Sequence, residues 1–282
     1  MLDAHPQLAI PPETQFVPEL IDAAKQPEAT PESLAELLVT HRRFGDFGID
    51  PDEMRATFTS IEPFDLAEAI RSFYRVYAEK QGKPRWGDKS PGYGWRMRLI
   101  DRNLPEARFI HLIRDGRDVS LSLTARQANP PPVAKQARHW RKRVRKTQRQ
   151  GRGARHYMEL RYEDLIRDPE AHLHRICEFV ELPFDDAMLR YHERATDRLA
   201  EISRELPAGQ ELYADHVRPA RPAEERLAIH RLTSEPPRSD RIEKWRSEMS
   251  PSDRAEFERV AGALLVQLGY EVESEAPGSI SG

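Results

Sequence analysis

The segment from Arg108 to Leu123 has the charged and hydroxyl side chains expected of an anion-binding site. An apolar run predicted to be a strand ends at Ile113, and Arg114 follows at its carboxyl end. Ligands of open α/β sheets bind in the crevice at such strand ends, where a guanidinium grips phosphate groups well. Ser122, two turns into the next predicted helix, would complete a phosphate-binding pair. The alternative is a surface network of arginine and aspartate at a helix start, and the spacing alone favours neither.

Two further charged residues follow predicted strands. Lys89 comes after the strand at 84–87 and could aim a positive charge at an anion. Glu13 comes after the short strand at 8–10, and a carboxylate beside bound cations is a candidate general base. The alternative is that both are solvated surface residues, with Asp88 only capping its turn.

The elements that must position these residues alternate between strand and helix. The predicted strands are 8–10, 84–87, 108–113 and 156–160, and the predicted helices are 93–103, 115–128, 133–150 and 168–180. This alternation favours a mainly parallel sheet with helices on both faces. Asp115 is predicted to cap the helix that follows Arg114, with Asp118 completing a capping box.

We expect one domain over residues 1–270, with a helical cap at 16–82 and a frayed tail at 271–282. Proline at the first helical position and Ser, Thr or Asp caps mark the helices of the cap. Residues 192–240 have weak periodicity and are predicted to be a long loop region, whereas an amphipathic helix is predicted from Ser250 to Gly269.

Composition excludes several classes of protein. The chain has 44 basic and 47 acidic residues, a net charge of −3, so its charge does not mark it as a nucleic-acid binder. Its mean hydropathy of −0.74, without a long apolar run, predicts no membrane span. Cys177 is the single cysteine, which excludes an internal disulfide and a zinc site made of several cysteines. A chain without a disulfide favours a cytoplasmic location. No metal site is predicted, since His172 and His174 point to different sides of their helix.

A predicted helix beginning near residue 133 has basic side chains throughout. Between Lys135 and Arg155 there are ten lysine and arginine residues and no acid. These side chains have three alternative roles: a solvated helix face, steering of an anionic substrate, or RNA contact with Trp140 as the stacking aromatic. We favour steering with solvation.

Together these segments resemble the sulfotransferases that use 3′-phosphoadenosine-5′-phosphosulfate (PAPS), in particular the bacterial and tyrosylprotein branches. The resemblance spans residues 1 to about 270. Its motifs are Leu2-Asp3-Ala4-His5-Pro6 through Glu13-Thr14, Gly87-Asp88-Lys89-Ser90-Pro91, Arg114 to Ser122, Arg161-Tyr162-Glu163-Asp164-Leu165, and Arg241 with Lys244-Trp245-Arg246. It implies a P-loop-NTPase-like α/β fold, a parallel sheet flanked by helices.

The resemblance also implies roles. The enzyme would move a sulfuryl group from PAPS to a hydroxyl or amine of a small-molecule or peptide acceptor, leaving 3′,5′-ADP. Glu13 would be the base, and Lys89 would stabilise the transition state. The residues implied to bind the nucleotide are Arg114, Ser122, Tyr162, Arg241 and Lys244.

One feature of the family has no match in this sequence. A strand and a loop rich in glycine, serine and threonine, which cradles the 5′-phosphosulfate, come in the family before the segment that matches Met1-Leu2-Asp3. We therefore expect a sheet without its first strand and phosphate loop. Two explanations are compatible with this: Met1 is an internal methionine of a longer protein, or the chain is truly truncated. A sheet lacking an inner strand favours pairing with another chain, so a homodimer is one expectation. The alternative function is a non-catalytic sulfotransferase-like binding protein or a truncated fragment.

Overall fold

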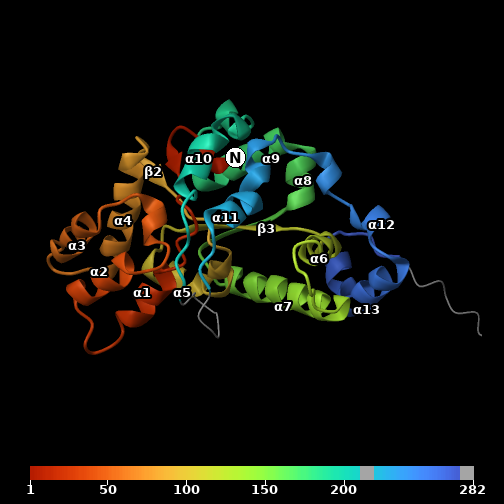
Figure 1. The fold of residues 1–282 in the computed structure, drawn as a ribbon, viewed down its shortest axis with the longest axis horizontal. Helices are drawn as coiled ribbons and strands as arrows, with labels where there is room; N and C mark the ends of the chain where they lie inside the picture. The colour runs from red at the N-terminus through yellow and green to blue at the C-terminus, as the bar shows by residue number, and fades with distance from the viewer. Residues whose placement is uncertain (210–218, 274–282) are drawn as a thin grey trace, which may run out of the picture.

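The computed structural model describes residues 1–209 and 219–273, and it has four short strands and mostly helical remaining elements (Figure 1). The strands are β1 (Leu8–Ala9), β2 (Arg85–Trp86), β3 (Arg108–Ile113) and β4 (His156–Arg161). The α-helices are α1 (Val17–Ala23), α2 (Pro31–Val39), α3 (Pro51–Thr59), α4 (Leu66–Lys80), α5 (Met97–Asn103), α6 (Gly116–Thr124), α7 (Val133–Gly151), α8 (Tyr162–Arg167), α9 (Pro169–Val180), α10 (Ala195–Glu201), α11 (Ala223–His230), α12 (Trp245–Glu248) and α13 (Pro251–Gln267). The 3-10 turns are η1 (Leu2–Ala4), η2 (Phe44–Phe47), η3 (Pro91–Trp95), η4 (Asp186–Met188), η5 (Tyr191–Arg194), η6 (Arg231–Ser234) and η7 (Ser239–Arg241).

The strands pair in two separate parallel sheets. In the first sheet Leu8 lies opposite Arg85, and in the second β3 pairs with β4 over the whole length of both strands. Parallel pairing between strands separated by helices confirms the predicted α/β class. Among the described residues, however, no strand joins β2 to β3, so the predicted sheet is present as two halves.

Residues 16–82, predicted to be a helical cap, contain the four helices α1 to α4. The side chains of Thr30, Asp50 and Asp65 accept hydrogen bonds from backbone N–H groups at the starts of α2, α3 and α4. The helices bury an aromatic cluster in which Phe73 lies 4.8 Å from Phe16 and 5.0 Å from Phe47, both edge to face. This packing holds the cap beside β1 and β2 (Figure 1).

A second core lies on the other side of the molecule. There α7 and α13 pack together with Ile113 at the end of β3, and they bury Trp140, Trp245 and Phe257. Cys177 is 2% exposed in a third cluster between β4 and α9, as expected of a structural thiol. The predicted final helix is confirmed by α13.

The prediction of a loop over 192–240 is wrong for its described part. That part contains α10 and α11 and three 3-10 turns, with one isolated antiparallel bridge between Leu206 and Arg221. The sequence pattern missed these helices because they are short and have few apolar positions. Most of the predicted tail, residues 274–282, lies outside the described residues.

Candidate active site

The carboxylate of Glu13 and the ammonium of Lys89 form an ion pair, with 2.5 Å between Oε1 and Nζ. Glu13 follows β1 and Lys89 follows β2, and the backbone bond from Gly87 N–H to the Ala9 carbonyl (2.8 Å) continues the parallel pairing toward them. Each residue follows a strand, as the sequence predicts, and the carboxyl ends of the two adjacent parallel strands bring them together.

Two further side chains of the N-terminal half surround the Glu13 carboxylate. The guanidinium of Arg43, from the turn between α2 and α3, lies 3.6 Å from Oε2, and the Gln15 amide donates to the same oxygen at 3.2 Å. Burial alone would raise the pKa of Glu13, but Lys89 and Arg43 more than offset it, so the pKa lies below its ordinary value. Glu13 is therefore ionised at neutral pH, as a base must be.

A polar network lies beneath this ion pair. The Asp88 carboxylate accepts hydrogen bonds from the Thr14 hydroxyl and from Tyr74 Oη (2.7 Å), and Tyr93 Oη lies 2.7 Å from the Thr14 oxygen. The Ser90 hydroxyl accepts from the Thr14 N–H at 3.1 Å. Burial raises the pKa of Asp88, and the hydrogen bonds offset this only in part. Because Thr14 follows Glu13 and Asp88 precedes Lys89, the network fixes the two backbones that present the pair.

The N-terminal segment is held by its own polar side chains. His5 is fully buried; its Nε2 lies 2.8 Å from the Pro183 carbonyl, and its Nδ1 accepts from the Gln7 N–H at 3.0 Å. These contacts assign the neutral tautomer with the proton on Nε2. Asp3 accepts from the Ile10 N–H at 2.8 Å, directly after β1. His5 and Asp3 therefore anchor the strand that leads to Glu13.

A second group of predicted residues gathers at the carboxyl ends of β3 and β4. The Arg114 guanidinium lies 5.1 Å from the Tyr162 ring centre and donates to the Arg241 carbonyl at 2.7 Å. Trp140 Nε1 donates to the Arg114 carbonyl at 3.1 Å, which fixes the backbone at the end of β3. The Nε of Arg114 is buried and has no hydrogen-bond partner among the described residues.

Asp118 does not complete the predicted capping box. Asp115 caps α6 by accepting from the Arg117 N–H (2.8 Å), but the Asp115 N–H donates to Glu163 instead (2.8 Å). Asp118 is 1% exposed and accepts from the N–H groups of Glu243 (2.8 Å) and Trp245 (2.9 Å). Local spacing predicted a contact within the helix, whereas the folded chain presents two backbone donors from 125 and 127 residues away.

Arg117 has a structural role that the sequence did not reveal. Its guanidinium pairs with Asp115 at 2.7 Å and Glu258 at 2.5 Å and lies 3.4 Å from the Trp245 ring centre. Arg117 and Asp118 together hold the segment from Arg238 to Trp245 against the start of α6. The only signal in the sequence was the density of charge after Arg114.

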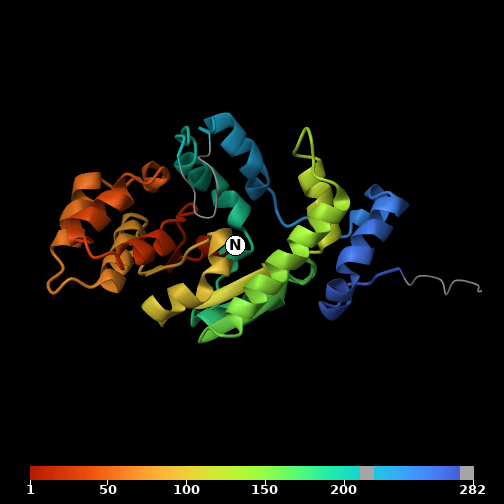
Figure 2. The same ribbon diagram turned by 90° about the horizontal axis from the view of Figure 1, so that it is seen from below.

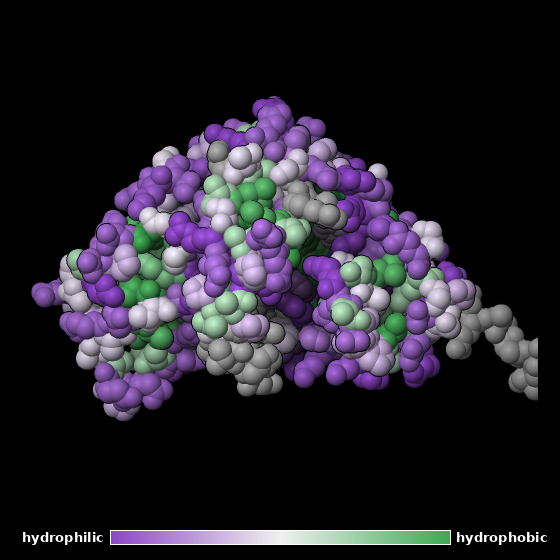
Figure 3. Space-filling view, viewed as in Figure 1, coloured by the Kyte–Doolittle hydropathy of each residue, from purple (hydrophilic) through white to green (hydrophobic). Residues whose placement is uncertain are grey.

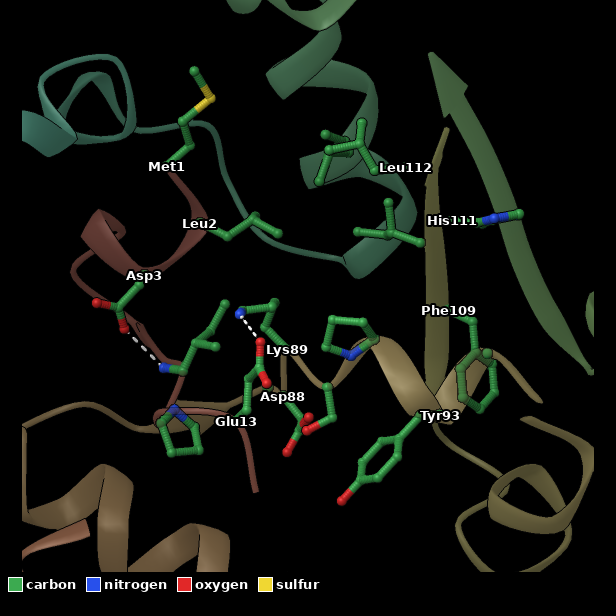
Figure 4. A pocket seen from close by; sticks show the side chains of 18 of the residues that line it. Met1, Leu2, Asp3, Glu13, Asp88, Lys89, Tyr93, Phe109, His111 and Leu112 are labelled. Carbon is green, nitrogen blue, oxygen red and sulfur yellow. Dashed lines mark hydrogen bonds and ion pairs between the residues drawn. The ribbon is translucent and has the colours of Figure 1, made fainter. Parts of the chain in front are cut away.

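A single cleft of 1740 Å³ joins the two groups of residues. It lies between β2 and β3 and is lined by Glu13, Lys89, Arg114, Tyr162 and Arg241. Figure 4 shows Glu13 facing Lys89 on one side, with His111 and Leu112 of β3 across the space. Leu112 is 46% exposed, an apolar wall that contrasts with the polar surface seen over much of the molecule in Figure 3.

The structure does not bring Ser122 and Lys244 to this cleft. Ser122 lies two turns along α6, and its carbonyl accepts from Arg126 at 2.9 Å. Lys244 pairs with Glu248 at 2.7 Å. His230 and Arg43, neither of them predicted, do line the cleft, on the side of the cap and α11. They lie far from Glu13 and Lys89 in the sequence, so no local motif points to them.

Among the described residues, no group of three or more histidine, cysteine, aspartate or glutamate side chains is arranged to hold a metal ion. No described helix is long and apolar enough to cross a bilayer. The cleft thus combines a carboxylate and an ammonium, Glu13 and Lys89, with a cationic and aromatic pocket around Arg114. This arrangement suits transfer of a group from an anionic nucleotide.

A family model described as "Sulfotransferase family" matches residues 1–186, which include the Glu13, Lys89, Arg114 and Tyr162 segments. The chain belongs to the sulfotransferase family.

Curated relatives agree with this assignment. A putative protein-tyrosine sulfotransferase of Caenorhabditis briggsae is 26% identical over 201 residues, covering 68% of this chain and 63% of that protein. The protein-tyrosine sulfotransferase A of Caenorhabditis elegans is 23% identical over 98% of this chain and 64% of that protein. This sulfotransferase-family chain therefore spans somewhat less than two thirds of the length of these relatives.

Solved structures confirm the fold. The sulfotransferase domain from the Synechococcus PCC 7002 olefin synthase superposes with a TM-score of 0.56 at 24% identity, covering 96% of this chain and 88% of that domain. The sulfotransferase domain from the curacin biosynthetic pathway superposes with a TM-score of 0.54 at 16% identity, covering 96% of this chain and 92% of that domain. The predicted α/β sulfotransferase fold is thus confirmed.

Proposed function

We propose that this protein transfers a sulfuryl group from PAPS to a hydroxyl or amine acceptor, with Glu13 as the base and Lys89 as the cation at the transferring group. The observation that carries the proposal is the Glu13–Lys89 ion pair (2.5 Å), which lies in the same cleft as Arg114 and Tyr162. The base and the cation would face the sulfuryl end of PAPS, and the Arg114 pocket would face its 3′-phosphate.

In the proposed step the acceptor oxygen attacks the sulfur, and the bond between sulfur and the bridging phosphate oxygen breaks. The acceptor proton moves to the Glu13 carboxylate, and the electron pair of the broken bond stays on the 5′-phosphate of 3′,5′-ADP. Lys89 would leave Glu13 to neutralise charge on the sulfuryl and bridging oxygens, and at 57% side-chain exposure it is free to turn. Positioning and charge neutralisation would carry most of the catalysis, as in phosphoryl transfer.

The donor's 3′-phosphate would lie at Arg114, since this guanidinium lines the cleft directly after the carboxyl end of β3. Tyr162, beneath the Arg114 guanidinium, offers an aromatic face to the adenine. Arg241 lines the same end of the cleft, and the proposal extends to Ser122 and Lys244 only if donor binding turns them inward.

Calorimetric titration with 3′,5′-ADP, followed by assay of transfer from PAPS to a panel of alcohols, phenols and tyrosine peptides, tests the proposal. We expect binding that requires the 3′-phosphate, with 5′-ADP as the control ligand, and transfer that requires Glu13. Binding indifferent to the 3′-phosphate would contradict the assignment of the Arg114 pocket.

A second candidate, nucleotide binding without transfer, is favoured by the separation of the two sheets. The edges of β2 and β3 that face the cleft pair with no described strand. Tight 3′,5′-ADP binding with no transfer to any acceptor would support this candidate instead.

We also propose a cytoplasmic location and a homodimer, the first from the single buried cysteine and the second from the open strand edges. Cell fractionation and the mass in solution test them; a membrane-enclosed pool or a monomeric mass would contradict them.

A further inference from the structure

The outer face of α7 has a straight row of positive charge. Six exposed basic side chains follow one another at alternating spacings of three and four residues, which places them on one side of the helix. We call them the basic stripe: Lys135, Arg138, Lys142, Arg145, Arg149 and Arg152. At a rise of about 1.5 Å per residue the row is about 26 Å long.

The basic stripe contributes little to the fold beyond the favourable place of Arg149 and Arg152 at the C-terminal end of the helix. None of its six side chains makes an ion pair or a hydrogen bond with another described residue. Like charges three and four residues apart destabilise a helix, and Lys135 lies in the first turn, where the helix dipole disfavours a cation. The opposite face, with Ala137, Trp140 and Val144, packs into the core and holds α7 in place.

The basic stripe is also separate from the proposed active site. The α7 residues that line the central cleft are Trp140, Arg143, Val144 and Thr147, on the other sides of the helix. Figure 2 shows α7 crossing the near side of the molecule when it is seen from below, with its outer face uncovered. The six side chains of the row therefore make no direct contact with a donor bound in the cleft.

We propose that the basic stripe is a docking surface for a partner protein that presents an acidic helix. Glutamate or aspartate side chains spaced three and four residues apart on such a helix would match the six cations along the row. Charge complementarity of this kind mainly sets the rate and specificity of association.

The surroundings of the stripe favour an acidic protein over other polyanions. Trp140, which could have stacked on a base, is 8% exposed and points into the core, so no aromatic platform for single-stranded nucleic acid lies in the row. The exposed large apolar residues of the described chain are Leu112, Val119, Ile229 and Val266, so α7 offers no anchor for a membrane. The nineteen residues of α7 hold eight basic and no acidic side chains, whereas the whole chain has a net charge of −3. The rest of the chain therefore has a net negative charge and repels an extended polyanion, whereas a short acidic helix contacts only the single basic row.

The test uses the full chain and a labelled synthetic helix of about 24 residues with glutamate at the spacing of the stripe. A matched peptide has glutamine at those positions. Binding is followed by fluorescence anisotropy at low and at physiological salt, with a DNA duplex and phosphatidylserine vesicles as competing polyanions.

Two triple variants with the same net charge separate a local surface from overall charge. The first, Arg138→Gln with Arg145→Gln and Arg149→Gln, removes half of the stripe. The second, Lys80→Gln with Arg175→Gln and Arg194→Gln, removes exposed charges elsewhere on the chain. Thermal unfolding verifies that both fold.

We expect the acidic peptide to bind more weakly at higher salt, and the first variant to bind it at least about tenfold more weakly than the second. The glutamine peptide should not bind. Equal weakening by both variants, no binding even at low salt, or tighter binding of the duplex or the vesicles would each overturn the proposal. None of these outcomes depends on sulfuryl transfer, because the stripe does not line the cleft.

Discussion

At the Glu13 end of the central cleft a carboxylate and an ammonium lie 2.5 Å apart, whereas at the Arg114 end the guanidinium lies 3.8 Å from the Asp118 carboxylate and donates to the Arg241 carbonyl. The first end is assembled mainly by two adjacent strands and their turns. The second depends on Asp118, Trp140 and the segment around Arg241, which come from distant parts of the chain. The proposed reacting groups are thus positioned mainly by sheet geometry, and the proposed anion pocket by contacts between distant segments.

The largest effect is expected for Glu13→Gln, which removes the base but keeps the size of the side chain. Transfer from PAPS should fall by about 10²- to 10⁴-fold, because the acceptor proton loses its destination. Affinity for 3′,5′-ADP should be unchanged, since Arg114 lies at the other end of the cleft. Steady-state kinetics and calorimetry measure the two quantities; a variant that keeps full activity would remove Glu13 from the mechanism.

Arg114→Ala should give the opposite result. Losing its charged hydrogen bonds should weaken 3′,5′-ADP binding by about 1.5–3 kcal/mol, or roughly 10- to 150-fold. Affinity for 5′-ADP should hardly change, because that ligand lacks the 3′-phosphate. Calorimetry with the two nucleotides provides the comparison, and an equal loss for both would indicate general damage to the cleft.

A smaller effect, on the order of three- to tenfold in 3′,5′-ADP affinity, is expected for Asp118→Asn. The amide keeps one oxygen and so can accept from only one of the N–H groups of Glu243 and Trp245. The segment that carries Arg241 would then have to be ordered on binding. Loss of the Asp118 charge 3.8 Å from the Arg114 guanidinium offsets part of this cost, which keeps the effect small. Asp88→Asn is the matched variant for the other end: it should lower the transfer rate and leave nucleotide affinity unchanged. If both variants changed the same quantity, the two ends would not be independent.

The smallest effect is a loss of stability in mild acid. Burial, with Arg43 and Arg42 nearby, lowers the pKa of His41 from 6.5 to about 4. Between these values the unfolded state binds a proton that the folded state does not, so stability falls as the pH drops from about 6.5 to about 4. Urea unfolding at several pH values should show a shallower fall for His41→Gln. His111, whose pKa burial also lowers to about 4, contributes in the same direction and remains in that variant.

The sequence predicted the residues that follow each strand better than it predicted their neighbours. Glu13, Lys89 and Arg114 were proposed because apolar runs mark strand ends, where ligands bind, and Tyr162 was proposed from the family resemblance; all four line the cleft. Arg43 and His230 were missed because they belong to the cap and to α11, and nothing in their local pattern refers to β1 or β2.

Other errors have the same origin. Asp118 was predicted to bond within its own helix because only local partners are visible in a sequence, whereas its partners lie more than a hundred residues away. Ser122 and Lys244 matched their motifs, yet α6 carries Ser122 past the cleft and Glu248 pairs with Lys244. The helices within 192–240 were missed because they have too few apolar positions for a periodic signal.

The order of polar and apolar residues along the chain was sufficient for the α/β class, the four strands and the helices within residues 16–82, since these depend on local periodicity. Four features emerged only from the folded chain: the two halves of the sheet, the cleft between them, the hydrogen bonds from a distant segment to Asp118, and the uncovered side of α7. Each of these depends on which distant surfaces pack together, and packing is a property of three-dimensional shape that a linear pattern does not contain.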